Sequence, residues 1–438
     1  MVRTFKRAVM LWIISVTAAA CGGEDDSVPI DPSVLKRKNP DIAAVAKLAA
    51  PAPALPKPKG PIVRVKTADA LYQAVATCKP GTTILLADGV YNLDRSVVIA
   101  TDRVSLRGAS GRREKVILDR GNKGRRGATV VTVADADDVL IADLTCRNSP
   151  GHGISIAAQY GPQRTRIYNV MFHNIWIRHI KGMHPKYPHE PVGPHRAEIM
   201  AKRPVGGSIR HCLFVNDRRK TNRRDGFNGD YVGGIDMMWL TDWVIADNVF
   251  IGIRGANGIG RGAIFVWVHS EGVVAERNVI VNCDRGICFG NPSGSPIHMT
   301  RGICRNNFIL GGVNTPIEMV RTADTKVYHN TVVAASPDFR RGIHFFQGAK
   351  GGRCFNNLLH GRLNLPKEVT AGNNVAGDLT GWFVNPAIGD LHLTDKAAGA
   401  IGQARALKAA GDDFDGQKRK PKPDVGADET PAAGKAKT

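Results

Sequence analysis

The sequence predicts an all-β fold, a solenoid of stacked parallel coils. Two short phrases recur along the 438 residues and alternate in step, whereas helical periodicity is nearly absent. Short strands that return once per repeat, with Asn and Gly between them, are typical of a solenoid and not of a sandwich or a doubly wound sheet.

The first phrase is an apolar residue, a short polar stretch that ends in Asn, and then a further apolar pair. It occurs at 245–250, 275–280, 303–308, 327–332 and 354–358, with looser copies around Asp143, Asn169, Cys212 and Asn373. An Asn at a tight turn tolerates the left-handed conformation, and its amide can bind main-chain groups of its own turn and of the next coil. We therefore expect stacked asparagines at one corner of the coils.

The second phrase is Gly or a small residue followed by apolar-x-apolar. Its isoleucines are Ile154, Ile235, Ile264, Ile287, Ile317 and Ile343, and the last five are separated by 29, 23, 30 and 26 residues. Because successive side chains of a strand point to opposite faces, the residue after each isoleucine points outward. This outward column contains Ser155, Asp236, Phe265, Cys288, Glu318 and His344, and a second column contains Ala157, Met238, Trp267, Gly290, Val320 and Phe346. In the less regular coil before Asp236, we expect Glu198 in the first column.

The N-terminal residues indicate export. Residues 1–20 begin with basic residues, continue with an apolar stretch and end in small residues, as an export signal does. Residues 16–22 resemble a bacterial lipoprotein signal, which implies a lipid on Cys21; the alternative is an ordinary signal cut near Ala20. We expect a Pro/Ala/Lys-rich spacer over 21–61, the solenoid over 62–430 and a disordered tail over 431–438.

The charge indicates an acidic partner. Lys and Arg number 60 against 39 Asp and Glu, and the formal net charge is +21. A hydrophobic fraction of 43% excludes a disordered chain. Export makes nucleic acid an unsuitable partner for this charge, so acidic polysaccharide is the partner we expect. A membrane contact is expected only through the N-terminal lipid, and the protein is expected to be a monomer.

The front and back of the solenoid carry a family resemblance. Residues 68–75, 80–84 and 88–91 resemble the capping helix and first strands of chondroitinase and alginate-lyase helices, and residues 389–393, 413–416 and 423–429 resemble the closing segment of such proteins. Over roughly residues 62–430 the chain resembles the pectin-lyase-like right-handed parallel β-helix proteins of bacteria. The resemblance implies the fold, whereas chemistry has to be argued from the residues.

Charged residues beside the outward columns are the candidate binding groups. If Glu198 and Asp236 lie on adjacent coils, they are roughly 5 Å apart and form a candidate Ca²⁺ or acid/base site, unless each pairs with a nearby Arg. Stacking would also align Arg196, Arg261, Arg285 and Arg341, with His152 in an earlier coil, into a basic ladder. Such a ladder suits repeating carboxylates or sulfates, unless turn carbonyls and acidic neighbours such as Asp284 already satisfy the arginines. Trp267, Phe265 and Phe346 are candidates for stacking on sugars, or for cover by a loop, and Glu318 and His344 complete the expected binding stripe.

Residues 173–233 form the largest interruption of the repeat, and we expect them to build a basic wall of a groove. This region contains His173, His179, His184, His189, His195 and His211. No pair of them has the spacing of a zinc site, so a basic wall is preferred to metal binding.

These features favour a polysaccharide lyase that cleaves a uronic-acid polymer. Such an elimination needs a base for the proton at C5 and a cation that neutralises the adjacent carboxylate. We expect Lys202 or Lys181 to be the base, and Arg203, Arg261 and Arg285 to neutralise or bind. The alternatives are a non-catalytic surface lipoprotein that binds acidic glycan, and a glycosidase or epimerase that uses Glu198, Asp236 and Glu318.

Overall fold

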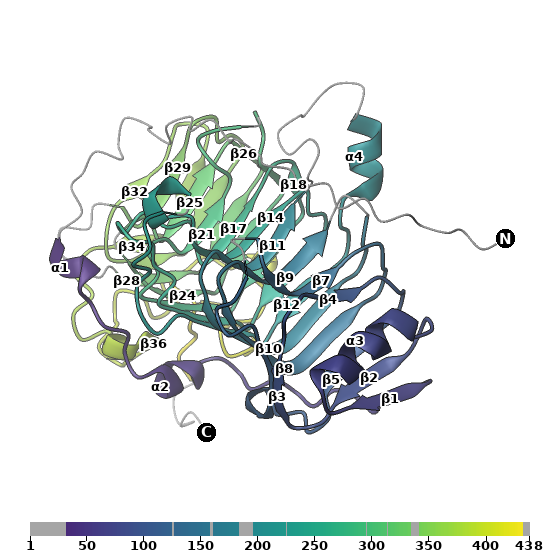
Figure 1. Ribbon diagram of the computed structural model, residues 1–438. Helices are drawn as coiled ribbons and strands as arrows, with labels where there is room; N and C mark the ends of the chain where they lie inside the picture. Colours follow the sequence, from purple (N-terminus) through teal and green to yellow (C-terminus); the bar gives the residue numbers. More distant parts are fainter. Residues whose placement is uncertain are drawn as a thin grey trace.

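Most of the chain winds into coils whose strands stack in parallel on those of the next coil (Figure 1). The computed structural model describes residues 32–124, 127–157, 161–183, 196–224, 226–294, 296–312, 314–333 and 341–431. The predicted all-β solenoid is confirmed, because almost all strand pairs in these residues are parallel. The predicted signal, Cys21 and the tail from 432 onward lie outside the described residues.

One large sheet, which we call sheet A, contains two ladders of strands, and two long strands, β8 and β10, belong to both ladders. The first ladder is β1 (Ile62–Val65), β2 (Thr83–Leu86), β5 (Ser105–Gly108), β8 (Leu140–Ser149), β10 (Arg166–Ile175), β12 (Ser208–Arg210), β15 (Val244–Ala246), β19 (Val274–Glu276), β23 (Ile303–Arg305), β27 (Lys326–Tyr328), β30 (Arg353–Phe355) and β33 (Thr370–Gly372). The second ladder adds β3 (Gly89–Asn92), β6 (Val116–Asp119), β13 (Leu213–Val215), β16 (Val249–Ile251), β20 (Val279–Val281), β24 (Phe308–Leu310), β28 (Thr331–Val333), β31 (Leu358–Leu359) and β34 (Val375–Ala376).

The other large sheet, sheet B, closes the coil and carries the predicted isoleucine column. Its strands are β4 (Val97–Ile99), β7 (Thr129–Val133), β9 (His152–Ala157), β11 (Arg178–Met183), β14 (Gly233–Met238), β17 (Ile264–Trp267), β21 (Ile287–Phe289), β25 (Ile317–Val320), β29 (Ile343–Phe346) and β32 (Leu363–Asn364). A small sheet C follows at one edge, with β18 (Ser270–Glu271), β22 (Met299–Thr300) and β26 (Thr322–Ala323). Inward residues of sheets A and B, among them the stacked rings of Phe172, Phe214 and Phe250, form one continuous core.

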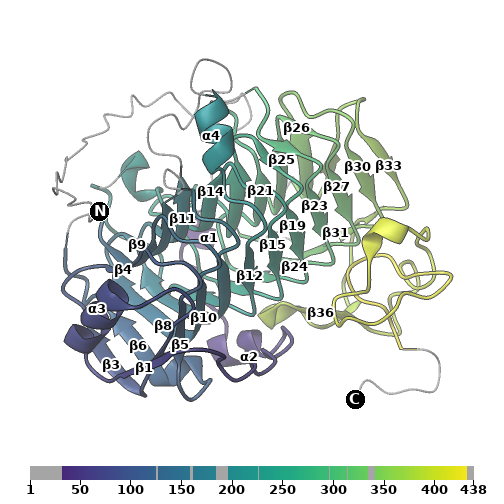
Figure 2. The same cartoon turned by 90° about the vertical axis from the view of Figure 1, so that its right-hand side faces the viewer.

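Helix α3 (Ala68–Thr77) caps the N-terminal end of the solenoid, as the sequence predicts (Figure 2). The hydroxyl of Thr67 accepts a hydrogen bond from the backbone N–H of Ala70 at 3.2 Å and begins the helix. Leu71, Ala74 and Val75 lie on its buried face and join the core. The helix therefore covers the apolar end that the first coil would otherwise expose to water.

The remaining helical segments are short. They are α1 (Pro32–Leu35), α2 (Ile42–Ala46), α4 (Arg196–Lys202) and the 3₁₀ turns η1 (Arg113–Lys115), η3 (Phe227–Gly229), η4 (Pro386–Ile388) and η5 (Lys408–Ala410). None of the helices in the described part of the chain is long and apolar enough to cross a membrane.

Stacked asparagines occupy one corner of six successive coils. Each side-chain amide donates to the side-chain oxygen of the next asparagine at 2.8–3.0 Å, through Asn248, Asn278, Asn307, Asn330, Asn357 and Asn374. The left-handed conformation belongs to the residue before each of them: Asp247, Arg277, Asn306, His329, Asn356 and Asn373 all have φ near +50 to +60°. The predicted ladder is thus present, but the strained turn position lies one residue earlier than expected.

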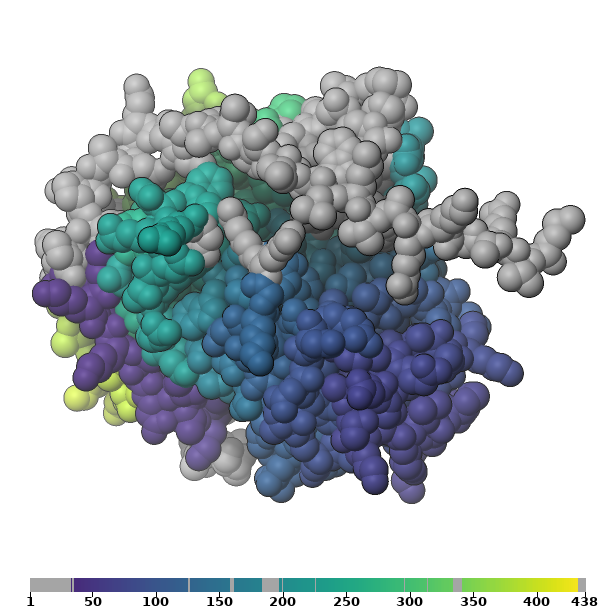
Figure 3. Space-filling model, viewed as in Figure 1, coloured from purple at the N-terminus to yellow at the C-terminus, as the bar shows by residue number. Residues whose placement is uncertain are grey.

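Residues 32–61, part of the predicted spacer, lie along the outside of sheet A. Val45 of α2 is fully buried against residues of the second ladder, such as Leu213 and Val249. The hydroxyl of Tyr168 donates to the carbonyl of Pro53 at 2.6 Å. The described part of this segment is therefore docked on the solenoid (Figure 3).

The C-terminal segment covers the same outer face, further along the solenoid. Its strands β35 (Phe383–Asn385) and β36 (Asp390–Leu393) form an antiparallel pair. Leu391, Phe414 and Val425 belong to the same apolar cluster as Val45. Helix α2 and strand β36 accordingly lie along one side of the coils (Figure 2).

Candidate functional site

The outward column of sheet B has the predicted register, with one addition. Strand pairing aligns Ser155, Lys181, Asp236, Phe265, Cys288, Glu318 and His344 in this order. Lys181 therefore occupies the position beside Asp236 that we expected for Glu198. The reason is that β11, in the middle of the irregular region 173–233, supplies the coil before β14.

Asp236 is the centre of a buried charged cluster. Its Oδ2 lies 2.6 Å from Nε of Arg178 and 2.8 Å from Nζ of Lys181, and its Oδ1 accepts from the indole N–H of Trp267 at 3.1 Å. The guanidinium of Arg178 lies over the ring of Tyr231, 4.0 Å from its centroid. Burial alone would raise the pKa of Asp236, but the charges of Lys181 and Arg178 outweigh it and hold the pKa well below its ordinary value.

His152 belongs to the same region, because strand pairing places it beside Arg178. Burial, together with the positive charges of Lys181 and Arg178, lowers the pKa of His152 to about 3. Its Nδ1 atom is buried and has no hydrogen-bond partner among the described residues. His152 is therefore a neutral imidazole at physiological pH, next to two cations.

Glu318 is the centre of a second cluster, further along the same column. Arg285 and Arg261 of the predicted basic ladder both reach it: Nη1 of Arg285 pairs with one carboxylate oxygen, and Nη1 of Arg261 lies 3.6 Å from the other. Arg261 also donates to the side-chain oxygen of Asn291. His344 follows Glu318 in register and stacks on Phe346 at 4.3 Å. Two predicted ladder arginines thus converge on one carboxylate.

Each cluster contains more positive than negative charge. Arg178 and Lys181 share Asp236, and two arginines share Glu318. Asp236 and Glu318 are each 1% exposed, so solvent screens these charges little. A carboxylate or sulfate placed against either cluster would balance the surplus charge.

Two of the three predicted aromatic residues of this face are covered, whereas Phe346 is half-buried. Trp267 is 8% exposed and Phe265 2% exposed, and their rings stack at 5.0 Å. Met200 of α4 packs against the apolar cluster that contains both rings. Of the two expectations for these two rings, the structure therefore supports cover, to which Met200 of α4 contributes.

Comparisons with known proteins identify a fold but not a family. No family model matches the chain, and no curated protein matches its sequence. Among solved structures, pectate lyase Pel9A matches with a TM-score of 0.53 and 11% identity, over 85% of this chain and 97% of that one. The chain is a right-handed parallel β-helix.

Two further solved structures match with lower TM-scores. An alginate lyase from Paenibacillus sp. str. FPU-7 matches with a TM-score of 0.45 and 14% identity, over 72% of this chain and 98% of that one. PfbA, a surface adhesin of Streptococcus pneumoniae, matches with a TM-score of 0.42 and 12% identity, over 70% of this chain and 86% of that one. With TM-scores below 0.5 these two matches carry no argument, and at 11% identity the likeness to pectate lyase Pel9A gives the fold alone.

The β-helix places the other sequence candidates on α4 and at its end, and not in the outward column. Glu198 lies on the exposed side of α4 and pairs with Lys202 at 3.1 Å, so the expectation that Glu198 adjoins Asp236 was wrong. Arg203 follows the helix and pairs with Glu271 of sheet C at 3.5 Å. Arg196 begins the helix, so it is not part of the stacked arginine ladder.

The proposed calcium ligands do not fit the ion. Both oxygens of Asp236 accept hydrogen bonds, and two of the donors are cations. Glu198 is on another element and has its own ammonium partner. A cation in contact with Asp236 would lie against two positive charges, so these residues do not form a Ca²⁺ site.

A different group of the β-helix has the spacing of metal ligands. Atoms of His392, Asp415 and Asp428 lie within 4.8 Å of one another and could hold a metal ion. Burial would lower the pKa of His392, but the carboxylates of Asp390 and Asp415 raise it to about 9. A protonated imidazole on β36 thus already pairs with Asp390 of the same strand and with Asp415 further along the chain.

Three histidines of region 173–233 lie in the described part of the chain, and each makes a different contact with its surroundings. His173 pairs with Asp217, and His211 packs edge-on against Tyr168. His179 takes the place of the small residue before Ile180 and is buried against Phe172 and Phe214. His184, His189 and His195 lie outside the described residues. His179 also explains why the sequence pattern missed β11, because Gly or another small residue stands at this position in the recognised coils.

Proposed function

We propose that this β-helix is an exported polysaccharide lyase that cleaves a uronic-acid polymer by β-elimination at the outer face of sheet B. The observation that carries the proposal is the cluster of Arg178, Lys181 and Asp236, with neutral His152 beside it. The amine of Lys181 would supply a base, and the guanidinium of Arg178 a partner for the substrate carboxylate. The imidazole of His152 would supply a hydrogen-bonding group.

Lys181 is the base in this proposal. Its Nζ lies 2.8 Å from Asp236, and Arg178 forms a second ion pair with the same carboxylate oxygen, so the amine is held in the outward column beside a guanidinium. A substrate carboxylate that pairs with Arg178 makes its C5 proton more acidic. The base removes that proton, the electron pair forms the C4–C5 double bond, the C4–O bond breaks, and the leaving oxygen takes up a proton.

Lys202, the other expected base, is less suited to this reaction. Its amine lies on α4 and pairs with Glu198, away from the outward column. Arg261 and Arg285 are proposed to bind a further acid group of the chain through the surplus charge around Glu318. Arg203, which pairs with Glu271, is proposed to contact substrate only at the sheet C edge.

The test is incubation with alginate, pectate and glycosaminoglycans, while the ultraviolet absorbance of unsaturated uronate is recorded. We expect one of these polymers to give product, Lys181→Met to abolish it, and Lys202→Met, as a matched control, to keep it. Lys181→Met leaves the Arg178–Asp236 pair intact, so folding is preserved, and thermal unfolding verifies this. An active Lys181→Met variant, or no product from any polymer, would refute the proposal.

The burial of the cluster favours a second candidate, a binding protein without turnover. Lys181 is only 4% exposed and Arg178 only 1% exposed. Binding of an acidic polymer without new absorbance and without new reducing ends would select this candidate. Asp236, one of the three carboxylates expected for a glycosidase, does not suit the role of general acid, because Lys181 and Arg178 hold its pKa well below its ordinary value.

We further propose that the mature protein is monomeric and anchored through a lipid on Cys21. The apolar stretch and small residues before Cys21 support this. In protein purified from membranes, the N-terminal peptide should begin at Cys21 and carry the added mass of the lipid, and a Cys21→Ser variant should lose that lipid.

A further inference from the structure

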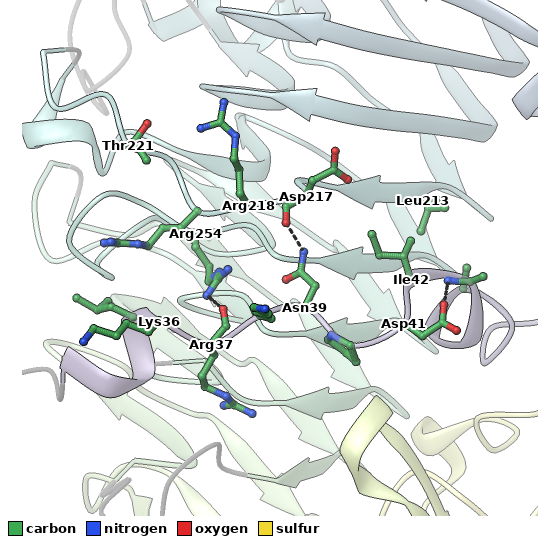
Figure 4. Close-up of a pocket in the computed structure, with 16 residues that line it drawn as sticks. Lys36, Arg37, Asn39, Asp41, Ile42, Leu213, Asp217, Arg218, Thr221 and Arg254 are labelled. Carbon is green, nitrogen blue, oxygen red and sulfur yellow. Dashed lines mark hydrogen bonds between the residues drawn. The ribbon is translucent and has the colours of Figure 1, made fainter.

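A cavity lies between the N-terminal segment and the outside of sheet A, on a different face of the solenoid from sheet B. Its volume is about 1030 Å³ (Figure 4). One wall is the segment from Leu35 to Ala46, and the other contains Leu213, residues 217–221 and Arg254. This volume is in the range of ligand-binding cavities.

Hydrogen bonds hold the two walls in a fixed relation. The amide of Asn39 donates to the carbonyl of Asn216 at 2.8 Å, and the amide of Asn282 donates to the side-chain oxygen of Asn39 at 2.8 Å. Arg254 donates to the carbonyl of Arg37 at 2.6 Å. The cavity is therefore built by specific contacts that span three coils, and it is not a chance gap between loose segments.

The lining of the cavity is strongly basic. Its cations are Lys36, Arg37, Lys38, Arg218, Arg219 and Arg254. The two carboxylates of the lining are already engaged: Asp41 caps α2, and Asp217 pairs with His173. Among the described residues, none of the six cations forms an ion pair with a carboxylate.

Two of these arginines have donors without acceptors. Arg254 is 5% exposed, and its Nε atom is buried without a hydrogen-bond partner, as is Nη1 of Arg37. Buried guanidinium donors without acceptors are unfavourable unless a ligand supplies the acceptors. Burial also lowers the pKa of both groups, which a bound anion would reverse.

We propose that this cavity binds a short stretch of an anionic polysaccharide, at a site separate from the sheet B cluster. The cations come from three segments of the chain, so they match several acid groups along one polymer better than a single oxyanion. Leu35, Ile42 and Leu213 supply apolar surface for the C–H faces of sugar rings. The identification of the ligand as an acidic polysaccharide, and not another polyanion, rests on the proposed function.

The test is titration calorimetry with tetragalacturonate and with a sulfated heparin tetrasaccharide. Full-length protein carrying Lys181→Met prevents turnover. The double variant Lys36→Gln/Arg218→Gln changes two exposed side chains, and Arg219→Gln/Arg254→Gln changes the inner ones. Arg64→Gln/Lys66→Gln removes the same charge from the exposed face around β1 and is the matched control.

We expect each cavity variant to weaken binding of at least one tetrasaccharide by about tenfold or more, with a smaller dependence on salt, whereas the control stays within about twofold. Equal affinities in all variants would overturn the proposal. So would saturation of the cavity by inorganic phosphate in a protein that binds neither tetrasaccharide.

The two proposals can fail separately. If wild-type protein cleaves no polymer but the cavity variants still lose binding, the lyase proposal fails and the cavity site stands. If cleavage depends on Lys181 while the cavity variants bind as the control does, the cavity site fails and the lyase proposal stands.

Discussion

Asp236 is the residue on which the sheet B cluster depends. It is the only carboxylate of the described residues that pairs with Arg178 or Lys181, and all three side chains are nearly buried. An Asn at this position would leave two buried cations without an anion. We therefore expect Asp236→Asn to lower the free energy of unfolding by about 3–5 kcal/mol, measured by urea denaturation.

Two comparisons decide whether charge is the cause of that loss. Adding Lys181→Met to Asp236→Asn removes one of the stranded cations and should recover part of the stability. The control is Asp217→Asn, because the half-exposed pair of Asp217 with His173 contributes less than about 1 kcal/mol. Equal losses in Asp236→Asn and Asp217→Asn would contradict the explanation.

Asp284 should make the stability of the protein depend on pH. Its pKa is raised, whereas that of Asp236 is lowered, so the stability that Asp284 contributes falls as the pH rises. Burial raises its pKa to about 7, although the backbone N–H groups of Gly255 and Gly260 donate to it. The folded state thus keeps a proton that the unfolded chain has lost, so this contribution to stability is present below pH 4 and disappears as the pH rises to about 7.

The Asp284→Asn variant should remove this dependence. The Asn oxygen can still accept from Gly255 and Gly260, but the side chain cannot ionise. We expect the melting temperature of the variant relative to wild type to be higher at pH 8 than at pH 5. A difference that is the same at both pH values would show that Asp284 does not titrate in this range.

At the scale of single residues, the sequence predicted the outward column but not all of its members. Asp236, Glu318 and His344 follow isoleucines that obey the repeat, so their register could be predicted. Lys181 could not be placed, because His179 stands where the pattern requires a small residue. The residues around Glu198 have the apolar spacing of the repeat strands, but they form helix α4 instead. Met200 of this helix packs against the apolar cluster that contains Phe265 and Trp267.

Among the elements, the asparagine ladder ties successive coils together. Asn307 donates to Asn330 and to the carbonyl of Ala275, and it accepts from the backbone and side chain of Asn278. Removing this amide in the interior leaves several buried polar groups without partners, and each costs about 1–3 kcal/mol. We therefore expect Asn307→Ala to lower the free energy of unfolding by about 3 kcal/mol or more.

The matched change is Asn374→Ala at the end of the ladder. Asn374 is only partly buried and has no further asparagine to bind. Its loss should therefore cost clearly less than that of Asn307 in the same denaturation experiment. Similar costs at both positions would indicate that the asparagines act in their own turns alone and do not act as a ladder.

The ladder itself was predictable from the recurring phrase, whereas its turn geometry was not. The phrase contains a polar residue before each Asn, and the left-handed conformation falls on that residue, whether it is Asp247, Arg277 or His329. An Asn side chain that donates to the next coil has its orientation fixed by the ladder. The strain of the turn is then carried by a neighbour whose identity varies, which leaves no residue signal in the sequence.

On the scale of the whole molecule, the docked N-terminal segment covers apolar surface of sheet A. Val45 is fully buried in the cluster that contains Leu213 and Val249. We expect Val45→Asp to release the segment without unfolding the coils, because the coils have their own core. Limited trypsin digestion should then cut at Lys36, Arg37, Lys38 and Lys47, while the β-sheet circular dichroism is unchanged.

The control for this experiment is Ala43→Asp, which places the same carboxylate on the exposed side of α2. It should leave the segment protected from trypsin. Rapid cleavage of wild-type protein at the same sites would contradict the docked arrangement.

Composition predicted a polar, Pro-rich stretch before the solenoid, but it did not predict that this stretch docks on the outer face of sheet A. The repeat required a parallel β-helix, and the structure confirms it. The docking of residues 32–61 depends on a few apolar contacts and on hydrogen bonds to residues far away in the chain. One example is the bond between Asn39 and Asn282, and a bond of this kind has no local signature in the sequence.

The same bond has a consequence for folding order. Asn39 is separated from Asn282 by 243 positions, so its partner is synthesised long after the segment itself. The N-terminal segment around Asn39 can therefore complete its docking only after the middle coils have formed. During that interval its basic residues are exposed, and docking is the late step that completes both the cavity and the cover of sheet A.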